Sequence, residues 1–309
     1  MTTTSTGDGA WTSVVGAVDI SDDVVIAHDV TLDGNVDMTG NLTINSGKSL
    51  DTTGSNHNLT VSGATSITGT LTCNASTVSL GSNVDDAYSV VVNASGTFTG
   101  GSGTHTLGAI NVSSSANNFT FSSGTTTING RATSGNSRRV FSTSATNKIT
   151  AVGTLVIDQA RTPLSIRCDD TTGINNLTMN CGSGRVLHID NNLTVGGDLN
   201  VSAGTVNTRN VGDTVDNDLT VTGVVTNNGT LTFNGSTVNL GSTIAHAGDF
   251  QGSGTFNFDT STINFHTGGT ANFTPDQSAT ADSNTSTLNL IRLDTSNKAH
   301  NFAFNTKNI

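Results

Sequence analysis

Apolar and polar residues alternate with a period of two along most of this chain, in short runs that end at Gly, Asn, Ser or Asp. Residues 41–44 (NLTI) and 58–61 (NLTV) are typical. This alternation predicts short β-strands whose Leu, Val and Ile point to one side and whose Thr points to the other, and the preceding Asn suits a turn. Related fragments recur at residues 118–121, 176–179, 192–195 and 218–221.

A longer unit is used twice. Residues 59–82 are LTVSGATSITGTLTCNASTVSLGS, residues 219–242 are LTVTGVVTNNGTLTFNGSTVNLGS, and 15 of the 24 positions are identical. The largest apolar change exchanges Cys73 for Phe233, and both residue types suit a core. A recurring unit predicts a repeat architecture, in which each unit buries its apolar face on its neighbours.

The spacing of the repeats is irregular, with 17 residues from Leu42 to Leu59 but 26 from Leu193 to Leu219. A strict hexapeptide left-handed helix would not vary in this way, whereas a right-handed parallel β-helix releases extra residues through its turns. We therefore expect an all-β chain that forms a right-handed parallel β-helix, a β-solenoid, of about 13 coils of about 20 residues. The solenoid is expected over residues 36–274.

Composition supports this fold. The chain contains no Glu, and its 23 acidic residues are all Asp. Helical surfaces normally use Glu, Lys, Ala and Leu, so the abundance of Thr, Ser, Asn and Gly favours strands. The net charge of −11 argues against nucleic acid as a partner, and no apolar run is long enough to span a membrane. The first residues lack the basic and apolar regions of a signal peptide, so if the protein works outside a cell we expect it to leave by another route, such as lysis.

The N-terminal stretch contains the only Trp, in 7–11 (GDGAW), followed by 22–34 (DDVVIAHDVTLDG). Because the first coil of a solenoid is open on one side, we expect an N-terminal cap over residues 1–35, with Trp11 as its plug. Residues 7–34 resemble the opening of extracellular and virion-borne β-solenoid proteins, including G8-like segments, filamentous-haemagglutinin-like solenoids and phage fibre or surface proteins. The resemblance implies a solenoid at the surface of a particle or cell.

Basic residues concentrate in the middle of the chain, where the repeat fades until Leu177, and residues 131–176 are predicted to be an interrupted or specialised segment. On one interpretation the basic residues form a contact patch for an acidic partner or a glycan. On the other they are solvated turn residues that balance nearby Asp. The seven residues, of 12 Lys and Arg in all, are Arg131, Arg138, Arg139, Lys148, Arg161, Arg167 and Arg185.

Eight of the 12 Phe lie beyond residue 230, which predicts a stacked aromatic ladder in that part of the solenoid. Residues 275–309 lose the repeat and are predicted to contact another subunit. Cys73, Cys168 and Cys181 are too few for a disulfide framework, so we expect buried core residues.

Catalytic and metal-binding residues were sought among the Asp and His. Glycoside hydrolysis usually needs two facing carboxylates, but each Asp cluster lies in a predicted turn, where Asp is an ordinary choice. We therefore predict no catalytic residue, no cofactor and no metal ligand, with calcium as the one ion that Asp-rich turns could attract. The clusters are Asp85 with Asp86, Asp169 with Asp170 beside Arg167, and Asp213, Asp216 and Asp218. The seven His, at positions 28, 57, 105, 188, 246, 266 and 300, lack metal-ligand spacing.

Thr-x-Thr motifs at residues 70–72 and 230–232 fit the flat face of an ice-binding solenoid. The other units carry one Thr each and the spacing varies, so ordinary strand composition is the favoured explanation.

The sequence thus predicts a non-enzymatic structural protein located on a virion surface or outside the cell: a bacteriophage decoration, fibre or tail-associated protein that acts as a stiff spacer. Expected partners are other virion or filament subunits, further copies of the chain, such as a trimer, and a cell-surface glycan, with no membrane insertion. The alternatives are an extracellular bacterial adhesin or filament subunit, and a polysaccharide-degrading tailspike with facing Asp and Arg in a groove.

Overall fold

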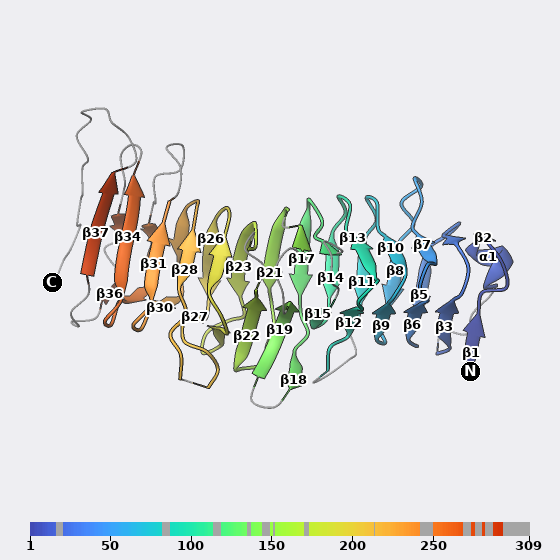
Figure 1. Cartoon of the computed structure of the whole chain (residues 1–309), viewed down its shortest axis with the longest axis horizontal. Helices are drawn as coiled ribbons and strands as arrows, with labels where there is room; N and C mark the ends of the chain where they lie inside the picture. The colour runs from blue at the N-terminus through green and yellow to red at the C-terminus, as the bar shows by residue number, and fades with distance from the viewer. Residues whose placement is uncertain are drawn as a thin grey trace. The chain divides into compact units, whose positions relative to one another are not determined.

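Short parallel strands make up nearly all of the computed structural model of this chain, and they stack into a β-solenoid of about ten turns (Figure 1). The only helix in the described residues is α1 (Trp11–Val14). The predicted all-β parallel solenoid is therefore confirmed, while its right-handed winding stays a prediction. The structure describes residues 1–16, 21–81, 87–113, 119–134, 137–143, 149–150, 152–169, 173–212, 214–241, 250–267, 273–275, 280–281 and 287–292.

Contacts within the chain define two compact units, and each has three parallel sheets. Unit 1 comprises Met1–Gly135, Arg139–Leu155 and Asp170–Thr172, and unit 2 comprises Asn136–Arg138, Val156–Asp169 and Gly173–Ile309. The division lies within residues 131–176, the segment that its composition had set apart, and it passes through β21 (Thr154–Ile157).

In unit 1 a typical coil contributes one strand to each of the three sheets. The first sheet contains β1 (Thr2–Thr4), β3 (Asp23–Ile26), β6 (Leu42–Ile44), β9 (Thr65–Ile67), β12 (Val90–Val92), β15 (Ile110–Val112) and β19 (Ser137–Thr143), with β18 (Ala132–Ser134) beside β19. The second contains β2 (Gly9–Ala10), β4 (Val30–Thr31), β7 (Ser49–Asp51), β10 (Thr70–Thr72), β13 (Thr97–Thr99), β16 (Phe119–Thr120) and β20 (Ile149–Thr150). The third contains β5 (Val36–Met38), β8 (Leu59–Val61), β11 (Val78–Leu80), β14 (His105–Leu107) and β17 (Thr125–Ile128).

Unit 2 follows the same plan. Its first sheet contains β22 (Leu164–Cys168), β24 (Val186–Ile189), β27 (Thr205–Asn207), β30 (Thr230–Thr232), β33 (Thr255–Asn257) and β36 (Thr280–Ala281). Its second contains β23 (Asn176–Asn180), β26 (Leu199–Ala203), β29 (Val225–Asn227), β32 (Phe250–Gly252) and β35 (Phe273–Pro275). Its third contains β25 (Leu193–Val195), β28 (Leu219–Val221), β31 (Thr237–Leu240), β34 (Thr262–Thr267) and β37 (Thr287–Arg292).

The duplicated sequence unit is one coil together with the first strand of the next. Residues 59–82 form β8 to β11, and Leu59 of β8 pairs directly with Val78 of β11. Residues 219–242 form β28 to β31, and Leu219 pairs with Val238 in the same way. The sequence repeat and the structural repeat therefore coincide.

Coil length varies while the strands stay in register. Val24 pairs with Leu42, 18 positions on, whereas Leu71 pairs with Phe98, 27 positions on. Coils are thus generally longer than the expected 20 residues, so the estimate of 13 coils was too high. The reason is that successive repeat starts lie on different faces: Leu42 belongs to the first sheet and Leu59 to the third, so the distance between them is not a coil length.

Alternate side chains of the strands fill the interior. In unit 1 the ring of Phe98 stacks on that of Phe119, with centroids 4.7 Å apart, in an aromatic cluster that the sequence did not predict. In unit 2 the rings of Phe256 and Phe258 stack at 6.0 Å, and Phe233 packs on Phe258, as expected of an aromatic ladder. The side chains of Phe250, Phe265 and Phe273 and all of Phe302 and Phe304 lie outside the described residues. Cys73, Cys168 and Cys181 are buried free thiols, as predicted.

Both ends of the chain contribute strands to the sheets. In the predicted cap, β1 pairs with β3, β2 pairs with β4, and the indole of Trp11 is buried. Whether Trp11 seals the first coil stays a prediction. Beyond residue 275, β36 pairs with β33 and β37 pairs with β34, so the stacking continues where the sequence repeat fades.

An asparagine turns the chain at the same corner of both repeated units. Asn74 and Asn234 are equivalent in the repeat, and both adopt a φ of 50°. The Nδ2 of Asn234 donates to Oδ1 of Asn207 at 2.7 Å and to Oγ1 of Thr208 at 3.3 Å, one coil away. Asn74 bonds to Asp51 and Thr52 in the same way. Asn tolerates this left-handed conformation better than most residues, and its amide ties successive coils together.

We expect Asn234→Ala to lower the free energy of unfolding by about 1–3 kcal/mol, because it removes these hydrogen bonds and places Ala at positive φ. Asn234→Gly should lose less, because Gly adopts the same backbone conformation without strain. Urea titration of both variants measures the difference, and Asn74→Ala and Asn74→Gly repeat the comparison in unit 1. Equal losses for Ala and Gly would show that backbone strain plays no part.

Candidate functional site

The Asp residues considered for catalysis are tied into the scaffold wherever the structure describes them. Nη2 of Arg167 lies 2.9 Å from Oδ2 of Asp169, and Nδ2 of Asn191 donates to Oδ1 of the same carboxylate. Asp218 accepts the backbone N–H of Thr237 at 2.8 Å. Asp85, Asp86, Asp170 and Asp213 lie outside the described residues.

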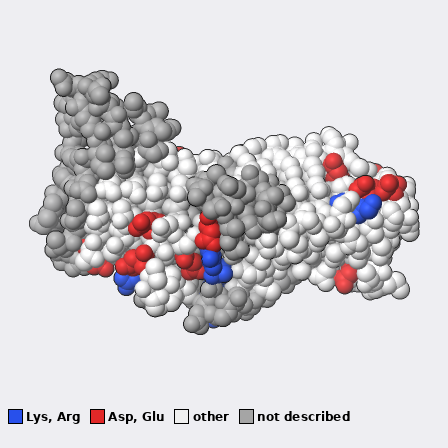
Figure 2. All heavy atoms as spheres, viewed as in Figure 1, with Lys and Arg blue, Asp and Glu red and all other residues white. Residues whose placement is uncertain are grey.

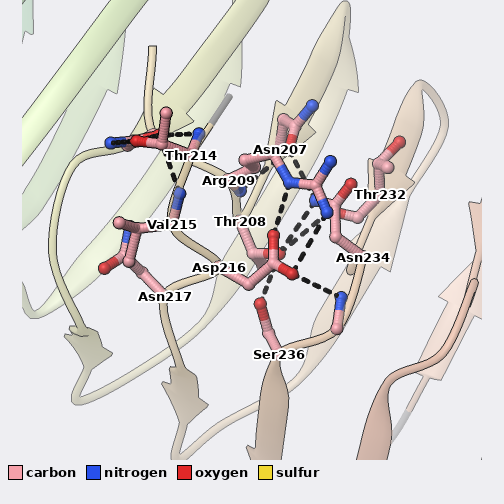
Figure 3. A network of polar contacts seen from close by, with 12 residues as sticks. Asn207, Thr208, Arg209, Thr214, Val215, Asp216, Asn217, Thr232, Asn234 and Ser236 are labelled. Carbon is pink, nitrogen blue, oxygen red and sulfur yellow. Dashed lines mark hydrogen bonds and ion pairs between the residues drawn. The ribbon is translucent and has the colours of Figure 1, made fainter. Parts of the chain in front are cut away.

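Asp216 belongs to a polar network in unit 2 (Figure 3). Nε and Nη2 of Arg209 donate to the two carboxylate oxygens of Asp216, at 2.5 and 3.1 Å, and the backbone N–H of Gly235 donates to Oδ2. The hydrogen bond from Arg209 holds the pKa of Asp216 below its usual value. This carboxylate is therefore ionised and already occupied by an arginine, as suits a structural clasp.

The clasp closes an excursion from the coil over residues 209–216. Leu193 pairs with Leu219, 26 positions on, whereas the next coil, from Leu219 to Val238, needs only 19. Asn210 Oδ1 accepts the backbone N–H of Thr214 at 2.9 Å, which shapes the tip, and Val215 there is 51% exposed. The sequence showed the Asp cluster here but not that Arg209 pairs with Asp216. These two residues meet only because the excursion folds back on itself.

The basic residues of the predicted patch belong to both units. Arg131 and Arg139 fall in unit 1, Arg138, Arg161, Arg167 and Arg185 fall in unit 2, and Lys148 is outside the described residues. Arg167 is paired with Asp169. On the face shown in Figure 2, charged side chains form small separate groups with broad uncharged surface between them.

Among the described residues, no group of three or more His, Cys, Asp or Glu is placed to hold a metal ion. Within that same part of the chain, no helix is long and apolar enough to cross a membrane.

The most regular polar surface is the outer side of the second sheet of unit 1, which we call the threonine face. One residue of each strand is inward and buried: Leu50, Leu71, Phe98 and Phe119. The residues next to it in the same strand therefore point outward. Their pairing in register forms two ladders: Thr31, Asp51, Thr72, Thr99, Thr120 and Thr150 in one, and Ser49, Thr70 and Thr97 in the other. The Thr-x-Thr motif at 70–72 has a partner at 97–99 that the sequence did not point to, because only strand pairing shows that these motifs are neighbours.

In unit 2, Thr205, Thr230 and Thr255 also pair in register, but two neighbouring ladders contain amide side chains that bond from coil to coil. Nδ2 of Asn257 donates to Oγ1 of Thr232 at 3.1 Å, and Nδ2 of Asn264 donates to Oδ1 of Asn239 at 2.8 Å. By contrast, the hydroxyl groups of Thr70, Thr72, Thr97 and Thr99 make no hydrogen bond to another described residue. The hydroxyl groups of these four Thr are therefore open to the surroundings, whereas the hydroxyl group of Ser49, at the edge of the face, donates to Asp29.

An unpaired histidine lies inside unit 1. His105 is fully buried, its two ring nitrogens have no hydrogen-bond partner among the described residues, and its ring meets Phe98 edge to face at 5.8 Å. Thr126, its partner in the next coil, has an unpaired buried hydroxyl group. Burial lowers the pKa of His105 to about 4, so the imidazole is neutral at pH 7.

Comparison with known proteins found no matching protein-family model, no matching curated protein and no matching solved structure.

We expect His105 to make the protein sensitive to acid. Its pKa is lower in the folded state than in the unfolded chain, so the unfolded state gains the proton first, and stability is lost as pH falls from about 6.5 through about 4. The loss reaches about 3 kcal/mol. His105→Leu should remove this pH-dependent loss of stability. The test is to measure the unfolding free energies of the wild type and the variant at pH 7, 5 and 4 and to compare their difference at each pH. A difference that does not change with pH would contradict the prediction.

The clasp of residues 209–216 is testable by a double-mutant cycle. Arg209→Met and Asp216→Asn should show a coupling energy of about 1 kcal/mol, because the pair is bidentate but partly exposed to solvent. Urea titrations of the wild type, both single variants and the double variant give this value. A coupling of zero would mean that the other hydrogen bonds hold the excursion.

Proposed function

We propose that this chain is a non-enzymatic structural protein of a virion surface: a decoration, fibre or tail-associated protein of a bacteriophage, in which the stacked coils act as a stiff spacer. The observation that carries the proposal is the solenoid itself, whose coils stay in parallel register while their lengths vary. Such a stack gains length coil by coil and presents a repeating outer surface.

Stiffness follows from the bonds between coils. Strands inside each sheet are paired on both sides, and polar side chains at the corners add further bonds from coil to coil, as at Asn74 and Asn234. A spacer needs this continuous bonding. The described Asp clusters serve the scaffold as well: Asp169 and Asp216 each hold an arginine.

The resemblance of residues 7–34 to virion-borne and extracellular solenoids supports the location. On this proposal the partners are neighbouring virion subunits, further copies of the chain, such as a trimer, and a cell-surface glycan. Contact with a partner would use exposed turns and excursions, of which residues 209–216 are the most clearly built.

A map of the intact particle that carries this chain tests the proposal. We expect the chain on a capsid or tail, with its contact residues buried against another subunit. A free filament without a virion would overturn the assignment in favour of the adhesin or filament protein. Incubation of the purified chain with long-chain polysaccharides is the second measurement, since a fall in viscosity that Asp169→Asn or Asp216→Asn abolishes would show a tailspike enzyme instead.

A further inference from the structure

We infer that the threonine face of unit 1 binds crystalline water. This inference does not depend on the virion proposal, because it rests only on the outer surface of the second sheet of unit 1. The irregular spacing of the repeats in the sequence does not disturb the Thr-x-Thr motifs. Coil length varies, but the variation is taken up outside the strands, so the Thr residues of successive coils remain directly beside one another.

The face is a two-dimensional lattice. Thr70 lies beside Thr97 and Thr72 lies beside Thr99, so two complete Thr-x-Thr motifs are in register. Strands in a sheet are about 4.8 Å apart, and alternate residues of a strand are about 6.6 Å apart, which sets the two repeats of the lattice. The ladder from Thr31 to Thr150 crosses six strands, which corresponds to roughly 24 Å.

The chemistry of the face suits ordered water. Each Thr presents a methyl group and a hydroxyl group on a stiff, β-branched side chain, so the pattern repeats from coil to coil. Water beside a methyl group has restricted orientation, while a hydroxyl group can donate to and accept from a water molecule at a fixed position. Charged groups would hold their own hydration shells. The one charge in the ladders, Asp51, is turned to the protein, because its Oδ1 accepts from Asn74 and from the backbone of Thr53.

A periodic array favours a periodic ligand. Each Thr contributes a weak contact, and many such contacts add up only when the ligand repeats with the same spacing as the face. Sugars are usually bound with the help of exposed aromatic rings, yet in the described residues the exposed large apolar side chains are only Met1 and Val215. The absence of aromatic rings from the face therefore favours ice over a polysaccharide.

Ice recrystallisation in the presence of the purified full-length chain is the direct test. The wild type should keep ice crystals small at a concentration at which an inert globular protein of similar mass has no effect. Thr72→Lys and Thr99→Lys, at the centre of the face, should each raise the concentration required at least tenfold. Thr60→Lys and Thr106→Lys are matched controls, because these outward Thr residues lie on β8 and β14 of the third sheet, and they should retain wild-type activity. Circular dichroism confirms that all four variants fold.

Two results would overturn the inference. The first is wild-type protein that affects ice no more than the inert protein does, and the second is activity that Thr72→Lys and Thr99→Lys leave unchanged. Sedimentation with crystalline cellulose and chitin covers the rival ligand: binding that the same two variants abolish, without an effect on ice, would assign the face to a polysaccharide. None of these results bears on where the chain lies in a virion, so the two proposals fail separately.

Discussion

The parallel register between successive coils is the constraint on which the rest of this structure depends. Each inward side chain lies beside its counterpart one coil away, as Leu59 lies beside Val78 and Phe98 beside Phe119. A slip of one residue would turn every apolar side chain of that strand outward, so burial fixes the register strongly. Variation in length is therefore confined to the segments between strands, where coils of 18 and 27 residues differ.

The turns and corners between strands accommodate the changes of direction and length that this register requires. Where the chain must change direction inside the stack, Asn74 and Asn234 adopt a left-handed backbone and bond to the coil below. Where a coil is longer than its strands and corners require, the extra residues form an excursion from the coil. The ion pair between Arg209 and Asp216 closes the excursion at residues 209–216. Asp169 and Asp216 likewise hold the scaffold, each by an ion pair with an arginine.

The register also shapes the outer surface, because fixing the inward residues fixes the outward ones between them. Some outward residues use this regularity to bond from coil to coil, as the amide side chains of Asn257 and Asn264 do in two sheets of unit 2. At the centre of the threonine face the hydroxyl groups of Thr70, Thr72, Thr97 and Thr99 stay open, so there the regular spacing is available to a ligand.

The sequence by itself determined the parallel solenoid, the identity of the repeated unit and the buried state of Cys73, Cys168 and Cys181, because period-two alternation and repetition are local properties of the chain. It also predicted the aromatic packing of Phe233, Phe256 and Phe258, in the part of the chain where Phe is frequent, but not the cluster around Phe98, where Phe is sparse. Only the tertiary structure decided which strands share a face. Leu42 and Leu59 have nearly the same local sequence yet lie in different sheets, whereas Thr72 and Thr99 are 27 positions apart and lie side by side. The physical reason is that pairing depends on the length of each turn, which determines the face on which the next strand falls, and no local pattern records that length.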